Sequence, residues 1–355
     1  MQGVTMRSLH IRTRRSFLRD SLAGCVGLST EPLASALRTP DLPSEGIAAG
    51  PRSRVVVLRD PMLHRRAPGN VSEELAPNLG RLSRLLDVSV NTLFGVQEPN
   101  QAWATVVRPG QKVGIKVNTL GGRGLSSNVL LIEAICERLQ QVGVRAQDVV
   151  VWDRDTEELR RAGFPIRIGG NQVQCFGTDR VGFEGELVSF GSVGSRLSKI
   201  LTRLCDVLIN VPVLKDHDGA GVSIALKNMY GVIHNPNKYH PNGCDPYVAD
   251  VNMLPEIRGR LRLHICDATT ACYEGGPAFK PEFTWRANSL LVSEDPVSLD
   301  TIGWQMIEHK RAQQGLKTLA DEGRAPRYIE TAADADHRLG IHARNRIDVV
   351  EAQMS

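Results

Sequence analysis

One stretch of the sequence, residues 113–152, limits the fold more than any other. Residues 113–117 (VGIKV) predict a short strand with its branched apolar side chains on one face and Lys116 on the other. Apolar side chains then recur at helical spacing over about 127–142. A second apolar strand follows at 148–152. Strand, helix and strand in this order form a βαβ unit, so we expect a parallel pair of strands with a right-handed crossover.

The rest of the chain continues this alternation. Residues 164–194 are rich in glycine and predict a smaller mixed or antiparallel excursion. Short apolar runs predict further strands at 54–58, 207–213, 261–266, 289–292 and 347–350. We therefore expect an α/β fold with a mostly parallel central sheet flanked by helices, in a single domain over residues 54–355.

The N-terminus has the pattern of an export signal. Arg14 and Arg15 precede a weakly apolar stretch that ends in ASA at residues 34–36. This arrangement is typical of a twin-arginine signal peptide, and the alternative is a disordered basic tail with a chance arginine pair. We expect a signal peptide at 1–36, a linker at 37–53, and periplasmic or other extracytoplasmic localisation through the twin-arginine export machinery.

Charge and hydropathy argue against several classes of partner. The leader holds five arginines against Asp20 and Glu31, a net of +3, which leaves about +1 of the formal +4 for the remainder. We therefore expect no nucleic-acid partner. After the leader, no apolar run approaches the roughly 20 residues that a transmembrane helix requires, so no membrane span is expected in the mature chain. A lipid anchor through Cys25 is an alternative for the leader, but Arg19 and Asp20 interrupt the pattern it needs.

Residues 206–244 hold the densest group of chemically reactive side chains. An apolar strand is expected to end in a glycine-marked loop that carries Lys215 and His217, and a helical segment with Lys227 and Asn228 follows. Loops at the carboxyl ends of strands bind ligands in open α/β sheets. This stretch is therefore the candidate site.

Four side chains of the stretch are of types that bind transition metals, namely His217, His234, His240 and Cys244. Their spacing matches no recognised metal signature, and the alternative is a solvated loop with one histidine hydrogen-bonded inside it. Proteins on the twin-arginine route often receive a cofactor before export. A transition metal is thus the candidate cofactor, whereas the absence of any C-x-x-C in the sequence gives no iron–sulfur motif.

Five short segments, in order, resemble the domain of unknown function 362 family of bacterial and archaeal proteins. They are 114–118 (GIKVN), 210–217 (NVPVLKDH), 225–231 (ALKNMYG), Asp267 with 274–277 (EGGP), and 293–300 (SEDPVSLD). The resemblance spans about 54–350 and implies that the polar residues of these segments form a site. Some members carry an added iron–sulfur segment with clustered cysteines, which this chain lacks.

The candidate residues divide into two roles. Lysines from separate strand and helix ends favour an anion if they converge, and a lysine with a lowered pKa is also a base or nucleophile. We assign a catalytic role to Lys215, His217, Lys227 and Asp267, and substrate binding to Lys116, Asn118, Asn228 and Glu274. Two further carboxylates have structural explanations, because Asp295 is expected to cap a helix and Asp300 to lie on its exposed face.

The sequence leaves three functions open. The first is an exported, cofactor- or metal-dependent enzyme that acts on a small anionic substrate, with oxidoreductase as the leading class because of the export signal. The second is a racemase- or epimerase-like enzyme in which lysine and histidine act as acid and base beside a carboxylate. The third is a periplasmic metal- or ligand-binding protein without turnover.

Overall fold

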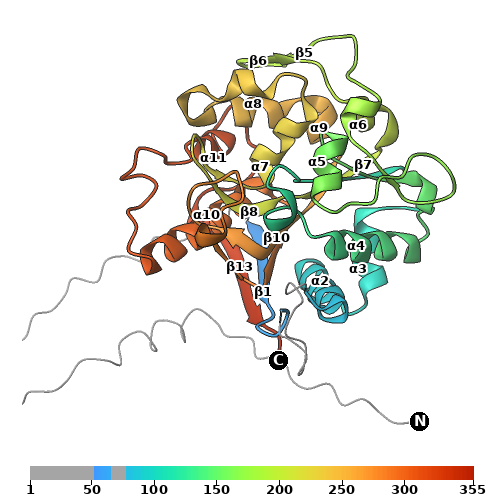
Figure 1. Cartoon of the computed structure of the whole chain (residues 1–355), viewed down its shortest axis with the longest axis horizontal. Helices are drawn as coiled ribbons and strands as arrows, with labels where there is room; N and C mark the ends of the chain where they lie inside the picture. The colour runs from blue at the N-terminus through green and yellow to red at the C-terminus, as the bar shows by residue number, and fades with distance from the viewer. Residues whose placement is uncertain (1–51, 65–76) are drawn as a thin grey trace, which may run out of the picture.

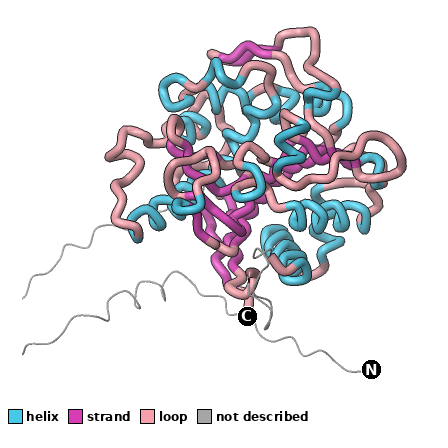
Figure 2. The backbone as a smooth tube through the Cα atoms, in the orientation of Figure 1, coloured by secondary structure: helices cyan, strands magenta, loops and turns pink. Residues whose placement is uncertain are grey.

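The computed structural model describes residues 52–64 and 77–355, so the predicted export signal and most of the predicted linker lie outside the described residues. Within the described part, eleven strands form one sheet that runs through the centre of the molecule (Figures 1 and 2). Its main path is β13 (Ile347–Gln353), β1 (Ser53–Arg59), β12 (Ser289–Ser293), β10 (Leu261–Cys272), β7 (Val207–Val211), β2 (Val113–Val117), β3 (Val149–Trp152) and β4 (Gln174–Cys175).

Most neighbours in this sheet are parallel, as the sequence predicted. The exceptions on the main path are the two pairs made by β12, which is antiparallel to both β1 and β10. Three short strands extend the sheet beyond the main path, namely β8 (Val213–His217), β9 (Gly221–Ser223) and β11 (Thr284–Trp285). The expected excursion contains a separate antiparallel pair, β5 (Val188–Phe190) and β6 (Val193–Ser195).

Helices cover both faces of the sheet. One apolar cluster joins a face of the sheet to α2 (Leu79–Phe94), α3 (Pro99–Val106), α4 (Val129–Gln141) and α5 (Thr156–Arg161). The other face packs against α6 (Lys199–Leu204), α7 (Ala225–Asn228), α8 (Tyr247–Met253), α9 (Pro255–Arg258), α10 (Pro296–Gln313) and α11 (Tyr328–Ala332). The apolar side chains of β2 all point into the first cluster, which confirms the strand face predicted from its alternation.

The chain changes direction across the sheet between β2 and β7. From β2 it moves to β3 and β4 on one side, and it then returns to place β7 on the other side of β2. In open α/β sheets, the crevice outside the carboxyl ends of strands at such a switch point is where ligands bind. The order of the strands therefore indicates that a ligand site would lie at the carboxyl ends of β2 and β7.

The end of β7 differs from the prediction of one strand followed by a loop. Pro212 separates β7 from β8, because proline has no N–H for the sheet, while its carbonyl accepts from the Asp267 backbone N–H at 2.8 Å. Lys215 and His217 consequently lie in a buried strand and not in a loop. Asp267 likewise lies within the twelve-residue β10 and not at a strand end.

Capping side chains begin α4 and α10, and one carboxylate of α10 does not lie where it was expected. Asn128 caps α4, with its side-chain oxygen accepting from the Leu130 N–H. Asp295 caps α10 as predicted. Asp300 was expected on the exposed face of α10, and this expectation is wrong because its side chain is fully buried. No helix in the described ranges is both long and apolar enough to cross a membrane.

Candidate functional site

A chain of hydrogen bonds joins the polar residues at the switch point. Lys116, near the carboxyl end of β2, donates from Nζ to Asp153 Oδ1 at 2.7 Å and to the Val117 carbonyl at 2.6 Å. Asp153 directly follows β3, the next strand of the sheet. The same Nζ lies 3.4 Å from Asn228 Oδ1 on α7. Two strand ends and one helix thus meet at Lys116.

Asn118 connects this group to Lys215. Its Oδ1 accepts from Lys215 Nζ at 2.6 Å, and its Nδ2 donates to Asn228 Oδ1 at 3.1 Å. Asn228 in turn donates from Nδ2 to Asn210 Oδ1 on β7 at 2.7 Å. Each side-chain amide in this chain of hydrogen bonds is therefore held by at least two neighbouring groups. Lys116, Asn118 and Asn228, which the sequence assigned to substrate binding, are brought together with Lys215.

Lys227 approaches the same group from α7. Its Nζ lies 3.3 Å from His240 Nε2 and 4.6 Å from the centre of the Tyr230 ring. The His240 ring stacks on the His217 ring with centroids 5.9 Å apart. We call Lys116, Asn118, Lys215, Lys227 and Asn228 the lysine–asparagine cluster, and the two histidines flank it.

The charges of the cluster are unbalanced. Lys116 forms an ion pair with Asp153. Lys215 and Lys227 are buried, and within the described residues no carboxylate lies at ion-pair distance from either of them. A buried ammonium group without a partner is costly, so each of these amines favours either a bound anion or the neutral form.

The pKa values follow from burial and from the neighbouring cations. Burial lowers the pKa of Lys215 to about 8, with Asp153 opposing this shift and Lys227 adding to it. Burial also lowers the pKa of Lys227. Burial, together with the positive charge of Lys227, lowers the pKa of His217 to about 2 and moves the pKa of His240 in the same direction. Both histidines are therefore neutral at physiological pH, and Lys215 is close to its titration point.

The residues predicted to bind a metal are only partly brought together. His217 and His240 stack, and Cys244 Sγ lies 3.8 Å from the His240 carbonyl oxygen. His234 is exposed and packs by its edge on the Phe183 ring. Across the residues that the structure describes, no three His, Cys, Asp or Glu side chains gather as a metal site would need. His217 and His240 therefore lie together, with Cys244 next to the His240 backbone, whereas His234 lies apart. The six cysteines in the described residues are free thiols.

Asp267 and Glu274 lie outside the cluster. Asp267 accepts from the backbone N–H groups of Asn128 and Thr269 at 2.7 and 2.9 Å, so it fixes the start of α4 to β10. Glu274 pairs with Arg311 and with Arg324, and Arg324 also donates to Asp216 at 2.8 Å. These contacts give both carboxylates a structural explanation, and no described hydrogen bond or ion pair joins either of them to the lysine–asparagine cluster.

Sequence reasoning missed two members of the site. Asp153 directly follows the strand predicted at 148–152. The pairing of that strand with β2 in one βαβ unit was the signal that Asp153 would meet Lys116. Asn210 occurs in one of the family-like segments, and on β7 it links Asn228 to the His264 ring at 3.1 Å. Its place in the middle of an apolar strand was the available signal, because buried polar side chains require partners.

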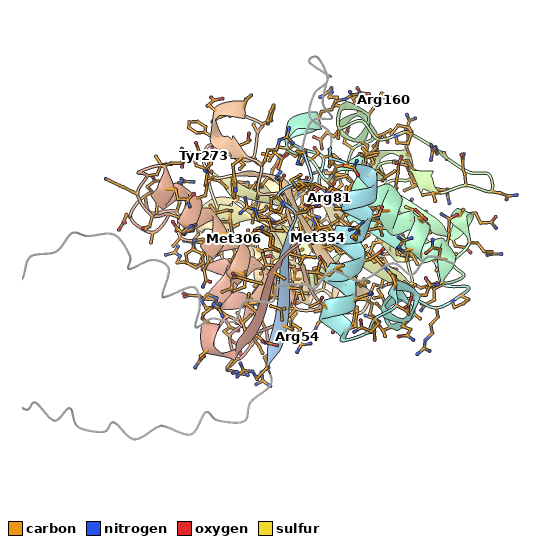
Figure 3. All side chains as sticks on the ribbon, turned by 90° about the horizontal axis from the view of Figure 1, so that it is seen from below. Arg54, Arg81, Arg160, Tyr273, Met306 and Met354 are labelled. Carbon is orange, nitrogen blue, oxygen red and sulfur yellow. The ribbon has the colours of Figure 1, made fainter. Side chains whose placement is uncertain are left out.

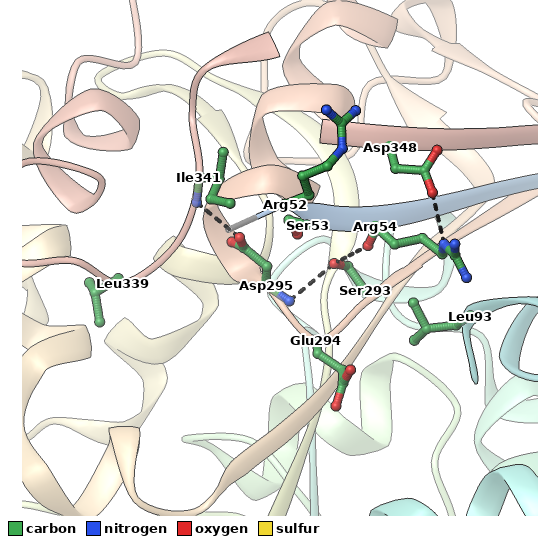
Figure 4. Close-up of a pocket in the computed structure, with 10 residues that line it drawn as sticks. All are labelled: Arg52, Ser53, Arg54, Leu93, Ser293, Glu294, Asp295, Leu339, Ile341 and Asp348. Carbon is green, nitrogen blue, oxygen red and sulfur yellow. Dashed lines mark hydrogen bonds and ion pairs between the residues drawn. The ribbon is translucent and has the colours of Figure 1, made fainter. Parts of the chain in front are cut away.

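A surface hollow lies at the opposite edge of the sheet. The residues that line it are Arg52, Ser53, Arg54, Leu93, Ser293, Glu294, Asp295, Leu339, Ile341 and Asp348 (Figure 4). In Figure 3, Arg54 lies at one end of β1, whereas Tyr273, just after β10, lies toward the other edge. Arg54 is paired with Asp348, and the Asp295 carboxylate accepts from the Ser298 and Ile341 N–H groups. With these charges satisfied, the hollow is a weaker candidate site than the lysine–asparagine cluster.

The fold and the cluster together define a class: an α/β protein whose buried lysines and asparagines meet at the switch point of a mostly parallel sheet. The chain belongs to the family described as domain of unknown function (DUF362), whose model matches residues 113–305. This match confirms the resemblance read from the short segments, and its range contains the whole lysine–asparagine cluster. A search of curated proteins gives no match to the chain.

Proposed function

We propose that this protein is an exported enzyme that binds a small anionic substrate at the lysine–asparagine cluster. The observation that carries the proposal is the pair of buried amines, Lys215 and Lys227, that have no carboxylate partner in the described residues. A carboxylate or phosphate group would supply the missing negative charge. Hydrogen bonds to charged groups contribute about 1.5–3 kcal/mol each, which is sufficient to select an anion over a neutral ligand.

Acid–base chemistry is the reaction class that the geometry supports best. A general base works most efficiently when its pKa is near the working pH, and burial brings the pKa of Lys215 to about 8. Asn118 accepts from its Nζ and thereby holds the amine in one direction. We infer that Lys215 exchanges a proton with the substrate and, in its protonated form, holds the anionic group together with Lys227, while Lys116 lies beside them in the cluster. Proton abstraction at a carbon beside a carboxylate fits these roles.

The oxidoreductase class rests on the export signal. It would require a redox group, and His217 and His240 are the described side chains closest to providing ligands for one at the site. A binding protein without turnover would use the same cluster and would lose affinity, but no reaction rate, when Lys215 is replaced.

Calorimetry with simple anions tests the proposal. We expect inorganic phosphate or malonate to bind wild-type protein, and we expect Lys215→Met to weaken that binding at least tenfold, since a charged hydrogen bond of about 1.5 kcal/mol corresponds to a tenfold change. Lys112→Met is the matched control, because it removes the same charge from an exposed position before β2. Equal affinities in wild type and Lys215→Met, with both folded, would refute the assignment.

Export is the second part of the proposal, and its support is the sequence of the leader. The pair Arg14 and Arg15 precedes an apolar stretch with a small-residue cleavage pattern. We expect the double substitution Arg14→Lys with Arg15→Lys to leave uncleaved precursor in the cytoplasm, measured by fractionation and immunoblotting. Unchanged processing of the double variant would show that the leader does not use the twin-arginine route.

A further inference from the structure

The short helix α7 carries two of the five residues of the lysine–asparagine cluster, Lys227 and Asn228. It has only four residues, too few to be stable from its own hydrogen bonds. All four are buried. Whatever fixes this turn therefore also fixes the positions of the Lys227 amine and the Asn228 amide.

Asp300 holds the beginning of α7. Its Oδ1 accepts from the Ala225 N–H at 2.7 Å and its Oδ2 accepts from the Leu226 N–H at 3.1 Å. These donors belong to the first turn, where backbone N–H groups have no partner within the helix. Asp300 comes from α10, about 75 residues later in the chain, and its side chain is fully buried.

The opposite side of the turn is held by two amides. Asn210 Nδ2 on β7 donates to the Ala225 carbonyl at 2.9 Å, and Asn252 Nδ2 on α8 donates to the Leu226 carbonyl at 2.9 Å. The backbone groups of the same two residues, Ala225 and Leu226, thus bind side chains from three elements. Of these three side chains, only Asp300 makes two hydrogen bonds to the turn.

We propose that Asp300 is a positioning residue of the lysine–asparagine cluster, which acts by fixing α7 so that Lys227 and Asn228 face Lys116, Asn118 and Lys215. Asp300 touches none of these polar groups in the described contacts, and its effect passes through the backbone of α7. The functional meaning of this role rests on the proposed anion site, but the positioning itself has a readout that needs no ligand.

The readout is the pKa of His240, measured by NMR of its ring. Lys227 Nζ lies 3.3 Å from His240 Nε2, and its positive charge helps burial to keep that pKa below the ordinary value. If α7 moves, Lys227 moves away from His240. We expect Asp300→Asn to raise the pKa of His240, as Lys227→Met should, because the amide nitrogen that replaces one carboxyl oxygen cannot accept an N–H bond.

Asp295→Asn is the matched control. Asp295 caps the same helix, α10, by accepting from the Ser298 N–H, and it also accepts from the Ile341 N–H after α11. Among the described hydrogen bonds, none joins Asp295 to α7. This substitution should lower stability by a similar mechanism and leave the pKa of His240 at its wild-type value. Asp300→Ser, with a smaller acceptor, is the second variant if Asp300→Asn does not fold.

The inference is overturned if Lys227→Met shifts the pKa of His240 and the Asp300 variants, once folded, do not. It is also overturned if Asp295→Asn causes the same shift, since that would indicate a general loosening. Absence of phosphate binding to wild-type protein would instead count against the proposed function. The two failures are therefore distinguishable.

Discussion

His264 is a buried histidine that is connected to the lysine–asparagine cluster through the side-chain amide of Asn210. It lies on β10, and its Nδ1 is 3.1 Å from Asn210 Nδ2, while Asn210 also holds Asn228. Burial lowers the pKa of His264 to about 3, so the ring is neutral and accepts from the amide. Protonation would remove this acceptor and place an unpaired charge in the core.

This shift predicts a specific loss of stability in acid. The folded-state pKa of His264 is lower than the unfolded value of about 6.5, so its contribution is complete above pH 6.5 and is lost as the pH falls toward 3. The slope is up to about 1.4 kcal/mol per pH unit for one group. His264→Asn should flatten the fall in the free energy of unfolding, measured by urea titration between pH 7.5 and 4.

Comparison with the variant is needed because other groups titrate in the same range. Burial raises the pKa of Asp216 to about 6 and that of Asp300 to about 8, so both oppose the histidines by favouring the folded state as the pH falls. Identical slopes for wild type and His264→Asn would show that His264 is not the acid-sensitive group.

At the residue scale, the sequence identified the lysines of the cluster but not the residues that hold them in position. Lys116 and Lys215 were identifiable because each was expected near the end of an apolar strand and bears a charge. Asp300 was not, since its partners are backbone groups 75 positions earlier and helical periodicity alone suggested an exposed face. His234 was grouped with the other histidines by chain distance, yet its ring turns toward Phe183.

At the scale of elements, the segment between α10 and α11 is fastened to the β8–β9 hairpin that carries Lys215. Arg324 donates to Asp216 from its side chain, and its carbonyl lies close to Gly221. A Cβ at Gly221 would be 2.1 Å from that carbonyl oxygen, and the φ of Gly221 is +77°. Only glycine satisfies both conditions.

Gly221→Ala is therefore expected to be strongly destabilising. The left-handed conformation costs a non-glycine residue about 1–2 kcal/mol, and displacing the Arg324 backbone should add about 1–3 kcal/mol. Gly323→Ala is the control, because Gly323 has a φ of +73° and nothing within 4 Å of its would-be Cβ. Chemical denaturation should show a larger loss for Gly221→Ala than for Gly323→Ala. Equal losses would mean that the contact with Arg324 does not constrain the hairpin.

Element boundaries were predictable where local signals are strong. The helix α4 and the strands β2 and β3 follow the periodicity of their own side chains. The break at Pro212 was not anticipated, because a proline between two apolar runs reads equally well as the end of a strand. The strand beyond it exists because β8 pairs with β10 and β9, partners that the local sequence does not reveal.

At the scale of the whole molecule, the fold class was predictable and the strand order was not. Residues 54–58, 289–292 and 347–350 each read as a strand, and the structure confirms all three. Their adjacency in the order β13, β1, β12 joins the two ends of the described chain. Nothing in the period of a strand identifies its neighbour, so this part of the topology depends on long-range packing.

The strand order separates two candidate regions on opposite edges of the sheet. The lysine–asparagine cluster occupies the carboxyl edge at the switch point between β2 and β7, where polar side chains are buried with unbalanced positive charge. The surface hollow at the amino edge has arginines as well, but Arg54 is paired with Asp348. An anion provides a direct way to distinguish the two.

The measurement that tests the central claim most directly is a crystal structure of the protein grown with selenate, located by the anomalous signal of selenium. Our account predicts a selenate ion within hydrogen-bonding distance, about 3 Å, of Lys215 or Lys227 Nζ. The peak should disappear in Lys215→Met and persist in Lys112→Met. Selenate bound only near Arg52 and Arg54 in the amino-edge hollow, with none at the cluster, would contradict the assignment of the site.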